Sequence, residues 1–258
     1  MAAQTPESDS LDARDGRPLL AATVSPLVRS EPALPMRAAL ERLSRLGFRG
    51  AQLSASDPES RPRDLSASAR RDLAATLARH ELLCSGVDLF IPPDHFTDPV
   101  HAARAFDAAH AALVLAADLG RAPLVLPSLD EAPSIREALA VEATRRGVRL
   151  ALLGGGPVAE PLSACIDCAA SLAAGLRPDA EILALGPSLG AVRVVDLLRS
   201  GMRGPIGRRG ESRLDVAALR VALGIGGFRG LPVVDARQWL APLDGLAASI
   251  DCWNAHAP

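Results

Sequence analysis

The sequence predicts an α/β fold and, within that class, a (β/α)8 TIM barrel. Strand-like and helix-like segments alternate along the whole chain, and eight of these segments have the composition of strands. The strand-like segments are apolar throughout instead of alternating with polar residues, which is typical of parallel strands covered on both faces. The length of 258 residues also matches the roughly 250 residues of eight β/α units.

The elements follow one another in a regular order. The expected strands are residues 19–26, 49–55, 82–91, 122–127, 147–153, 181–185, 191–198 and 231–235. The expected helices are residues 36–47, 67–80, 97–120, 134–146, 161–175, 213–224 and 237–254. Apolar residues at helical spacing support them, as Ala39, Leu40, Leu43 and Leu46 do in the first helix. These limits leave a very short connection between the sixth and seventh strands.

The tetrapeptide Gly-Phe-Arg-Gly occurs twice, at residues 47–50 and 227–230. Each copy ends a helix-like segment and precedes a strand-like one. Its first glycine permits the left-handed conformation that commonly ends a helix, and Phe48 or Phe228 can pack under that helix end. We therefore expect both copies at helix-to-strand corners on the N-terminal rim of the barrel.

The composition narrows the possible classes of protein. The chain is 48% hydrophobic with a net charge of −2, and no apolar run approaches the length of about 20 residues that a membrane helix needs. The near-neutral charge gives no support for nucleic acid binding. Residues 1–16 are acidic and polar, so we expect a disordered arm there and not a secretory signal, followed by one TIM-barrel domain over residues 17–258. Four cysteines without a framework spacing indicate a reducing compartment, so we expect a cytoplasmic protein.

Two residue types are absent from the chain. All 28 basic residues are arginine, so there is no lysine, and there is no tyrosine either. Schiff-base aldolases and pyridoxal enzymes need a lysine amine, and these classes are therefore excluded. A Walker-type phosphate loop is excluded for the same reason.

Several segments resemble the xylose-isomerase-like barrels, the family of sugar isomerases and epimerases that also contains endonuclease IV. In the first half these are ALERLSRLGFRGAQLSA, RPRDLSASARRDLAATLARHELLCSGVDL and AALVLAADLGRAPLVL. In the second half they are RRGVRLALL and GRRGESRLDVAALRVALGIGGFRGLPVVD. The resemblance covers about residues 17–240. It implies a barrel that acts on a sugar or sugar phosphate.

The resemblance also implies a divalent metal, Mg²⁺, Mn²⁺ or Zn²⁺, held by Glu, Asp, His and Glu at strand ends. The fifth-strand Glu falls at Leu153, and the sixth-strand Asp and its His fall near Gly186 and Leu189. The seventh-strand His falls near Arg193, and Asp235 replaces the final Glu. Two carboxylates without further ligands hold such an ion weakly. We therefore expect a degenerate metal site and predict no cofactor.

Three residues are candidates for proton transfer. His95 follows the third strand beside Asp94, at the catalytic face, and could be a general acid or base. The alternative is a loop histidine that bonds to backbone or solvent. Asp196 and Asp235 are the acidic groups near the places where the family has ligands.

The segment RSGMRGPIGRRGESR, after the seventh strand, has five arginines among glycines. Loops at this place in a barrel commonly bind phosphate, and guanidinium forks suit phosphate or carboxylate. We expect Arg203, Arg208 and Arg209 to form an anion pocket. The alternative is a solvated loop whose arginines pair with Glu211 and Asp215.

Cys165 and Cys168 form a CxxC motif that could bind zinc or act in redox chemistry. Both fall inside the expected helix 161–175, and no second pair of ligands accompanies them. We therefore interpret them as small core residues of that helix.

Two functions from different classes remain open. The first is an isomerase or epimerase of a sugar or sugar phosphate, with His95, Asp196 and Asp235 moving protons. The second is an inactive barrel that serves as a small-molecule-binding or scaffold protein. In both, the expected partner is a carbohydrate or phosphosugar, with neither nucleic acid nor membrane. The sequence does not indicate the oligomeric state.

Overall fold

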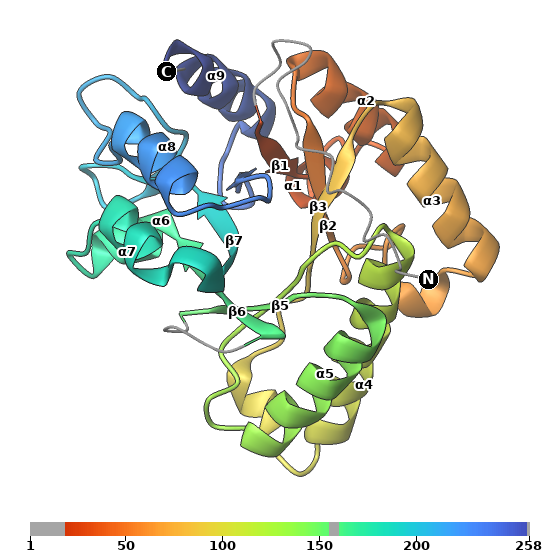
Figure 1. Ribbon diagram of the computed structural model, residues 1–258. Coiled ribbons are helices and arrows are strands. Elements are labelled where there is room, and N and C mark those ends of the chain that lie inside the picture. The colour runs from red at the N-terminus through yellow and green to blue at the C-terminus, as the bar shows by residue number, and fades with distance from the viewer. Residues whose placement is uncertain (1–18, 155–159, 257–258) are drawn as a thin grey trace, which may run out of the picture.

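The computed structural model describes residues 19–154 and 160–256, and the predicted arm lies outside this range. Eight strands form a closed barrel in the order β1-β10-β7-β6-β5-β4-β3-β2, and all neighbours are parallel. Helices surround the strands, as Figure 1 shows. The prediction of a (β/α)8 barrel is therefore confirmed. None of the described helices has both the length and the apolar character to cross a membrane.

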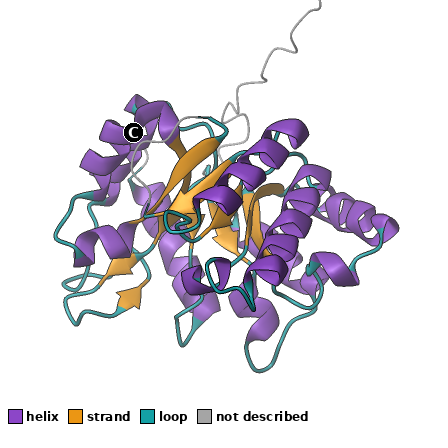
Figure 2. Ribbon diagram, turned by 90° about the horizontal axis from the view of Figure 1, so that it is seen from below, coloured by secondary structure: helices purple, strands orange, loops and turns teal. Residues whose placement is uncertain are grey.

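The barrel strands are short and mostly buried. They are β1 (Ala21–Thr23), β2 (Gly50–Ser54), β3 (Leu83–Asp88), β4 (Leu124–Leu126), β5 (Leu150–Leu153), β6 (Leu162–Asp167), β7 (Leu189–Val194) and β10 (Val233–Val234). Strands β8 (Asp196–Leu197) and β9 (Arg203–Gly204) pair with each other in a separate antiparallel hairpin. The two short arrows of this hairpin lie apart from the barrel strands in Figure 2.

The α-helices lie between the strands. They are α1 (Ser25–Arg29), α2 (Met36–Leu46), α3 (Ala67–Arg79), α4 (Ala102–Asp118), α5 (Pro133–Arg146), α6 (Cys168–Ala173), α7 (Pro178–Leu185), α8 (Val216–Ile225) and α9 (Pro242–Ala255). The described residues also form three 3-10 helices, η1 (Pro62–Asp64), η2 (Pro93–Phe96) and η3 (Gly186–Ser188).

The sixth strand is not where the sequence predicted it. Residues 181–185, expected as a strand, belong to helix α7, and the expected helix 161–175 begins with strand β6. Short apolar segments fit either period, and this ambiguity caused the error. Pro178 at the first position of α7 was the missed signal, because proline favours a helix start. The connection between β6 and β7 is therefore long and holds α6 and α7.

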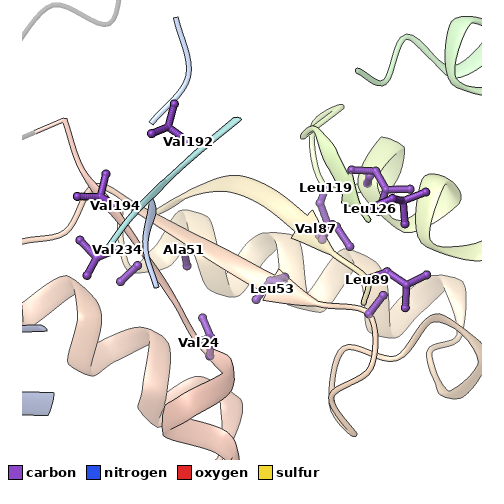
Figure 3. Close-up of a cluster of buried hydrophobic side chains, with 14 of the residues drawn as sticks. Val24, Ala51, Leu53, Val87, Leu89, Leu119, Leu126, Val192, Val194 and Val234 are labelled. Carbon is purple, nitrogen blue, oxygen red and sulfur yellow. The ribbon is translucent and has the colours of Figure 1, made fainter. Parts of the chain in front are cut away.

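Alternate residues of each strand pack outward against the helices. Val87 and Leu89, from β3 and the residue after it, and Val192 and Val194 of β7 lie in one buried cluster, part of which Figure 3 shows. Because successive side chains of a strand point to opposite faces, Asp88 and Arg193 point into the barrel. The apolar side chains thus lie beneath the helices, and the charged side chains point into the lumen.

Both Gly-Phe-Arg-Gly corners lie at the N-terminal rim, as predicted. Gly47 adopts a left-handed φ of 97° after α2, and Gly227 has a φ of 68° after α8. Phe48 is completely buried, whereas Phe228 is partly exposed. The corners are also close in space, because a side chain at Gly50 would approach Leu231 Cδ1 to 2.6 Å.

Candidate functional site

The C-terminal ends of four barrel strands bring together charged side chains that are far apart in sequence. Asp88 ends β3 and Asp167 ends β6, while Arg193 lies near the end of β7 and Asp235 follows β10. Asp88, Arg193 and Asp235 are buried, with exposed fractions of 2%, 8% and 6%. Buried charges are stable only when they are paired, so their partners define the site.

The central pair of this site crosses the lumen. Arg193 donates from Nη2 to Oδ1 of Asp88. Strands β3 and β7 stand on opposite sides of the barrel, with three strands between them in either direction. The ion pair therefore joins two opposite walls of the barrel through its interior.

Arg237 extends this pair into a network. Its guanidinium donates to both carboxylate oxygens of Asp235, at 2.8 and 2.6 Å, and to Oδ2 of Asp88. Burial alone would raise the pKa of Asp235, but the hydrogen bonds and charge of Arg237 outweigh it and hold that pKa below its usual value. Burial tends to lower the pKa of Arg237, and the two carboxylates outweigh this effect and raise it. Both groups are therefore charged at neutral pH.

Two further ion pairs complete the mouth. Arg29 of α1 donates to Asp57, which also accepts from Ser25 Oγ at 2.5 Å. Arg203 of β9 donates to Oδ2 of Asp167 at 2.7 Å. Four guanidiniums thus stand against four carboxylates, counting Arg193 and Arg237 with Asp88 and Asp235. The formal charges of these eight side chains sum to zero, and three of the eight, Arg29, Arg237 and Asp88, line the adjacent cavity.

A cavity of about 370 Å³ opens beside this network. This volume lies within the range of roughly 300–1,000 Å³ found for small-molecule sites. Six of its eight lining residues have polar side chains, and the eight are Ser25, Pro26, Arg29, Ser54, Ser56, Asp88, Phe90 and Arg237. Nearby in the barrel, Gln52 Oε1 and Arg193 Nε are buried and have no hydrogen-bond partner among the described residues. The barrel interior beside the cavity therefore retains unused hydrogen-bonding capacity.

The strand ends do not fit a divalent metal. The revised position of β6 makes Asp167 its terminal acidic residue, which corrects the expectation that this position falls near Gly186. The four positions then hold Leu153, Asp167, Arg193 and Asp235. Within residues 19–154 and 160–256, no three His, Cys, Asp or Glu side chains gather in a way that could hold a metal ion. A guanidinium at the seventh strand repels a cation, and leucine offers no donor.

The structure separates the three residues predicted for proton transfer. Asp235 lies in the mouth. Asp196 is completely buried in the hairpin and accepts from Ser212 Oγ and from the backbone N–H groups of Arg213 and Leu214, so it anchors the loop. His95 lies in η2 with its ring centroid 4.6 Å from that of His101, and it does not line the mouth cavity.

The three arginines predicted to bind phosphate are also spread out. Arg203 pairs with Asp167 at the mouth, Arg208 lies 3.3 Å from Glu211 at the surface, and Arg209 is exposed. Arg203 and Arg208 both line a second cavity of about 630 Å³, whose walls are mostly apolar and include Trp239.

Cys165 is on strand β6 and not in a helix, which corrects the sequence interpretation. Burial raises the pKa of its thiol to about 12. The thiol is therefore protonated and unreactive. Its role as a small buried residue agrees with the prediction.

Sequence reasoning missed most of the mouth. Asp88, Arg193 and Arg237 were not proposed as site residues, although Arg193 interrupts the apolar segment AVRVV. A charged residue inside a buried strand needs a partner, and this signal could have identified it. The partner itself could not be found, because the pair spans the barrel.

No protein-family model and no curated protein sequence matches the chain. Solved structures do match it, at low identity. D-allulose 3-epimerase from Methylomonas sp. in complex with D-allulose is 15% identical, with a TM-score of 0.70 over 93% of this chain and 98% of that one. An L-ribulose 3-epimerase is 16% identical, with a TM-score of 0.71 over 92% and 93%. A xylose isomerase-like TIM barrel protein from Mycobacterium smegmatis in complex with magnesium is 14% identical, with a TM-score of 0.69 over 93% and 96%.

These matches cover nearly the whole length of both chains. At this identity they establish the fold, while the residues at the strand ends differ from the metal-binding set that the resemblance implies. The chain therefore has the fold of the xylose-isomerase-like TIM barrels.

Proposed function

We propose that this protein is a carbohydrate-binding barrel whose mouth holds a neutral saccharide without a metal ion. The observation that carries the proposal is the one-to-one balance of four guanidiniums and four carboxylates around the mouth. Guanidiniums donate to sugar oxygens, and carboxylates accept from sugar hydroxyls. A charge-balanced site offers hydrogen-bond donors and acceptors without preferring an anionic ligand.

The hydroxyl groups of the cavity support the same ligand. Ser54 and Ser56 lie with their Oγ atoms 2.8 Å apart, and Arg29 donates to Ser56 Oγ at 2.9 Å. Hydroxyls can donate or accept, so they adapt to a polyol. The structural neighbour crystallised with D-allulose has a sugar as its ligand, and this is consistent with the proposal.

Binding is favoured over isomerase or epimerase chemistry. Such chemistry needs a base whose pKa lies near the working pH. The pKa of Asp235 is lowered by Arg237, which makes this carboxylate a weak base. Neither His95 nor Asp196 lines the cavity that would hold the substrate.

Calorimetric titration tests the proposal. Glucose, fructose, xylose and allulose are titrated into the protein, and the 6-phosphates of glucose and fructose serve as their anionic counterparts. We expect at least one neutral sugar to bind and the phosphate to add no affinity. The Arg29→Ala variant should weaken binding, whereas Arg37→Ala, in an exposed pair with Asp72, is the matched control. Binding restricted to the phosphorylated sugars contradicts the proposal, and so does the absence of any binding.

The same samples report on catalysis. Each ketose is incubated with the protein and analysed by chromatography for new sugars. The proposal predicts no interconversion. Formation of an epimer or aldose at a rate that depends on protein concentration would establish an enzyme instead.

A further inference from the structure

An exposed aromatic ring borders the mouth cavity. Phe90 is 62% exposed and lines the mouth together with Asp88 and Arg237. It is the only aromatic residue among the large hydrophobic side chains that are exposed in the described part of the chain. The chain has five phenylalanines and no tyrosine, so an aromatic ring at this position stands out.

The backbone around Phe90 explains how the ring reaches the cavity. Val87 and Leu89 pack into the buried cluster, as Figure 3 shows, and Phe96 farther along is 3% exposed. Leu89 N–H still donates to Val125 O, so the extended backbone continues past the end of β3, and Asp88 and Phe90 both line the cavity. Phe90 is therefore exposed, whereas Val87 and Leu89 are buried. The apolar face of its ring lies beside charged groups.

We propose that Phe90 is the stacking platform for the ring form of the saccharide, so that the site selects a cyclic sugar over an open-chain polyol. This inference rests on the proposed function. A pyranose has a face of C–H groups and a rim of hydroxyls. The C–H groups carry partial positive charge and suit the negative face of an aromatic ring. The rim hydroxyls then meet Ser54, Asp88 and Arg237.

An alditol carries the same hydroxyls but has no flat C–H face. It can satisfy the serines and the ion pairs, but it gains little from Phe90, and ordering its flexible chain costs conformational entropy. Contact with the aromatic ring therefore separates the two classes of ligand.

The test compares ring-locked sugars with open-chain polyols. The probes are the methyl β-pyranosides of glucose, galactose and xylose, which cannot open, and the alditols sorbitol, galactitol and xylitol. In the wild type we expect one pyranoside to bind about tenfold more tightly than its alditol. Phe90→Ala should reduce this ratio by weakening the pyranoside and leaving the affinity for the alditol unchanged. Phe90→Trp should restore the preference and change its fluorescence when the pyranoside is added.

Val141→Ala is the matched control, because Val141 is 65% exposed on α5 and does not line the cavity. Circular dichroism and the melting temperature establish that each variant is folded. Equal affinity for pyranosides and alditols, or a preference unchanged in Phe90→Ala, overturns the inference while the proposed function stands. Failure of every probe to bind overturns the inference alone if a free sugar binds in the calorimetric titration, and it overturns both if no free sugar binds.

Discussion

The barrel mouth and the loop formed by residues 199–213 are both rich in arginine, but apart from Arg203, which pairs with Asp167 at the mouth, they use it differently. In the mouth, Arg193 is 8% exposed and pairs with Asp88 across the lumen. In the loop, the side chains of Arg208 and Glu211 are 57% and 44% exposed, and Arg209 forms no ion pair with a described residue. One region holds its charges in fixed positions, and the other leaves them in solvent.

This difference shows that the number of arginines in a segment is a poor guide to a binding site. An exposed ion pair contributes only about 0–1 kcal/mol, because water screens it and two long side chains must be ordered. A buried charge must keep its partner, since removal of one member leaves the other unpaired in a medium of low polarity. The mouth is therefore the region in which single substitutions should have large effects.

The largest effect is expected from Asp88→Ala. It removes the carboxylate that accepts from both Arg193 and Arg237, so two guanidiniums lose a buried partner. We expect the free energy of unfolding to fall by about 3–5 kcal/mol. Glu211→Ala, in the loop, should cost no more than about 1 kcal/mol. Urea unfolding measures both values, and similar costs for the two variants would remove the distinction between the regions.

The next effect concerns the residue that joins the loop to the barrel. Asp196→Ala leaves the N–H groups of Arg213 and Leu214 without their acceptor, which should cost about 1–3 kcal/mol. The affinity for the saccharide should stay within about twofold of the wild-type value. This corresponds to a change in binding free energy well below the 1.4 kcal/mol of a tenfold difference. Calorimetry on the folded variant checks this expectation. A complete loss of saccharide binding by a variant with unchanged stability would show that Asp196 belongs to the binding site.

The pH dependence of stability should depend on Asp235. The pKa of its carboxyl is lower in the folded protein than in the unfolded chain, where it is about 3.9. The contribution of Asp235 to the free energy of unfolding is therefore present above about pH 4, and it is lost as the pH falls through the pKa of the folded protein. The slope is at most about 1.4 kcal/mol per pH unit for one group. Asp235→Asn should be less stable at pH 7, and its difference from the wild type should shrink in acid. A difference that stays constant from pH 7 to acid would show that Arg237 does not lower this pKa.

The smallest effect is expected for the loop arginines. Arg208→Ala combined with Arg209→Ala should change the free energy of unfolding by less than about 1 kcal/mol. Phosphate should raise the melting temperature of the wild type no more than sodium chloride of equal ionic strength does. A phosphate-specific increase that this double variant abolishes would instead establish an anion pocket.

The sequence predicted the barrel because its signal is repeated in many segments. Apolar strands and helix ends such as Gly47 recur, so one misplaced strand did not change the fold class. The position of the sixth strand was predicted wrongly because Leu162–Asp167 fit the period of a helix as well as that of a strand. The mouth was mostly missed because its pairs join β3 to β7, and nothing local in the sequence records a contact across a lumen. Asp235 was proposed because it falls where the resemblance places the family's final Glu, and although it lies in the mouth, its role in proton transfer stays a prediction.

The central claim is that a charge-balanced mouth binds a neutral saccharide with no metal ion. The most direct test is the thermal stabilisation of the wild type by the tightest-binding neutral saccharide, measured first with EDTA and then with Mn²⁺. At about 100 times its dissociation constant, the sugar should stabilise by roughly 2.7 kcal/mol. The account predicts the same increase in melting temperature under both conditions, because Arg193 and Leu153 leave no place for the ion. An increase that appears only with Mn²⁺ would contradict it.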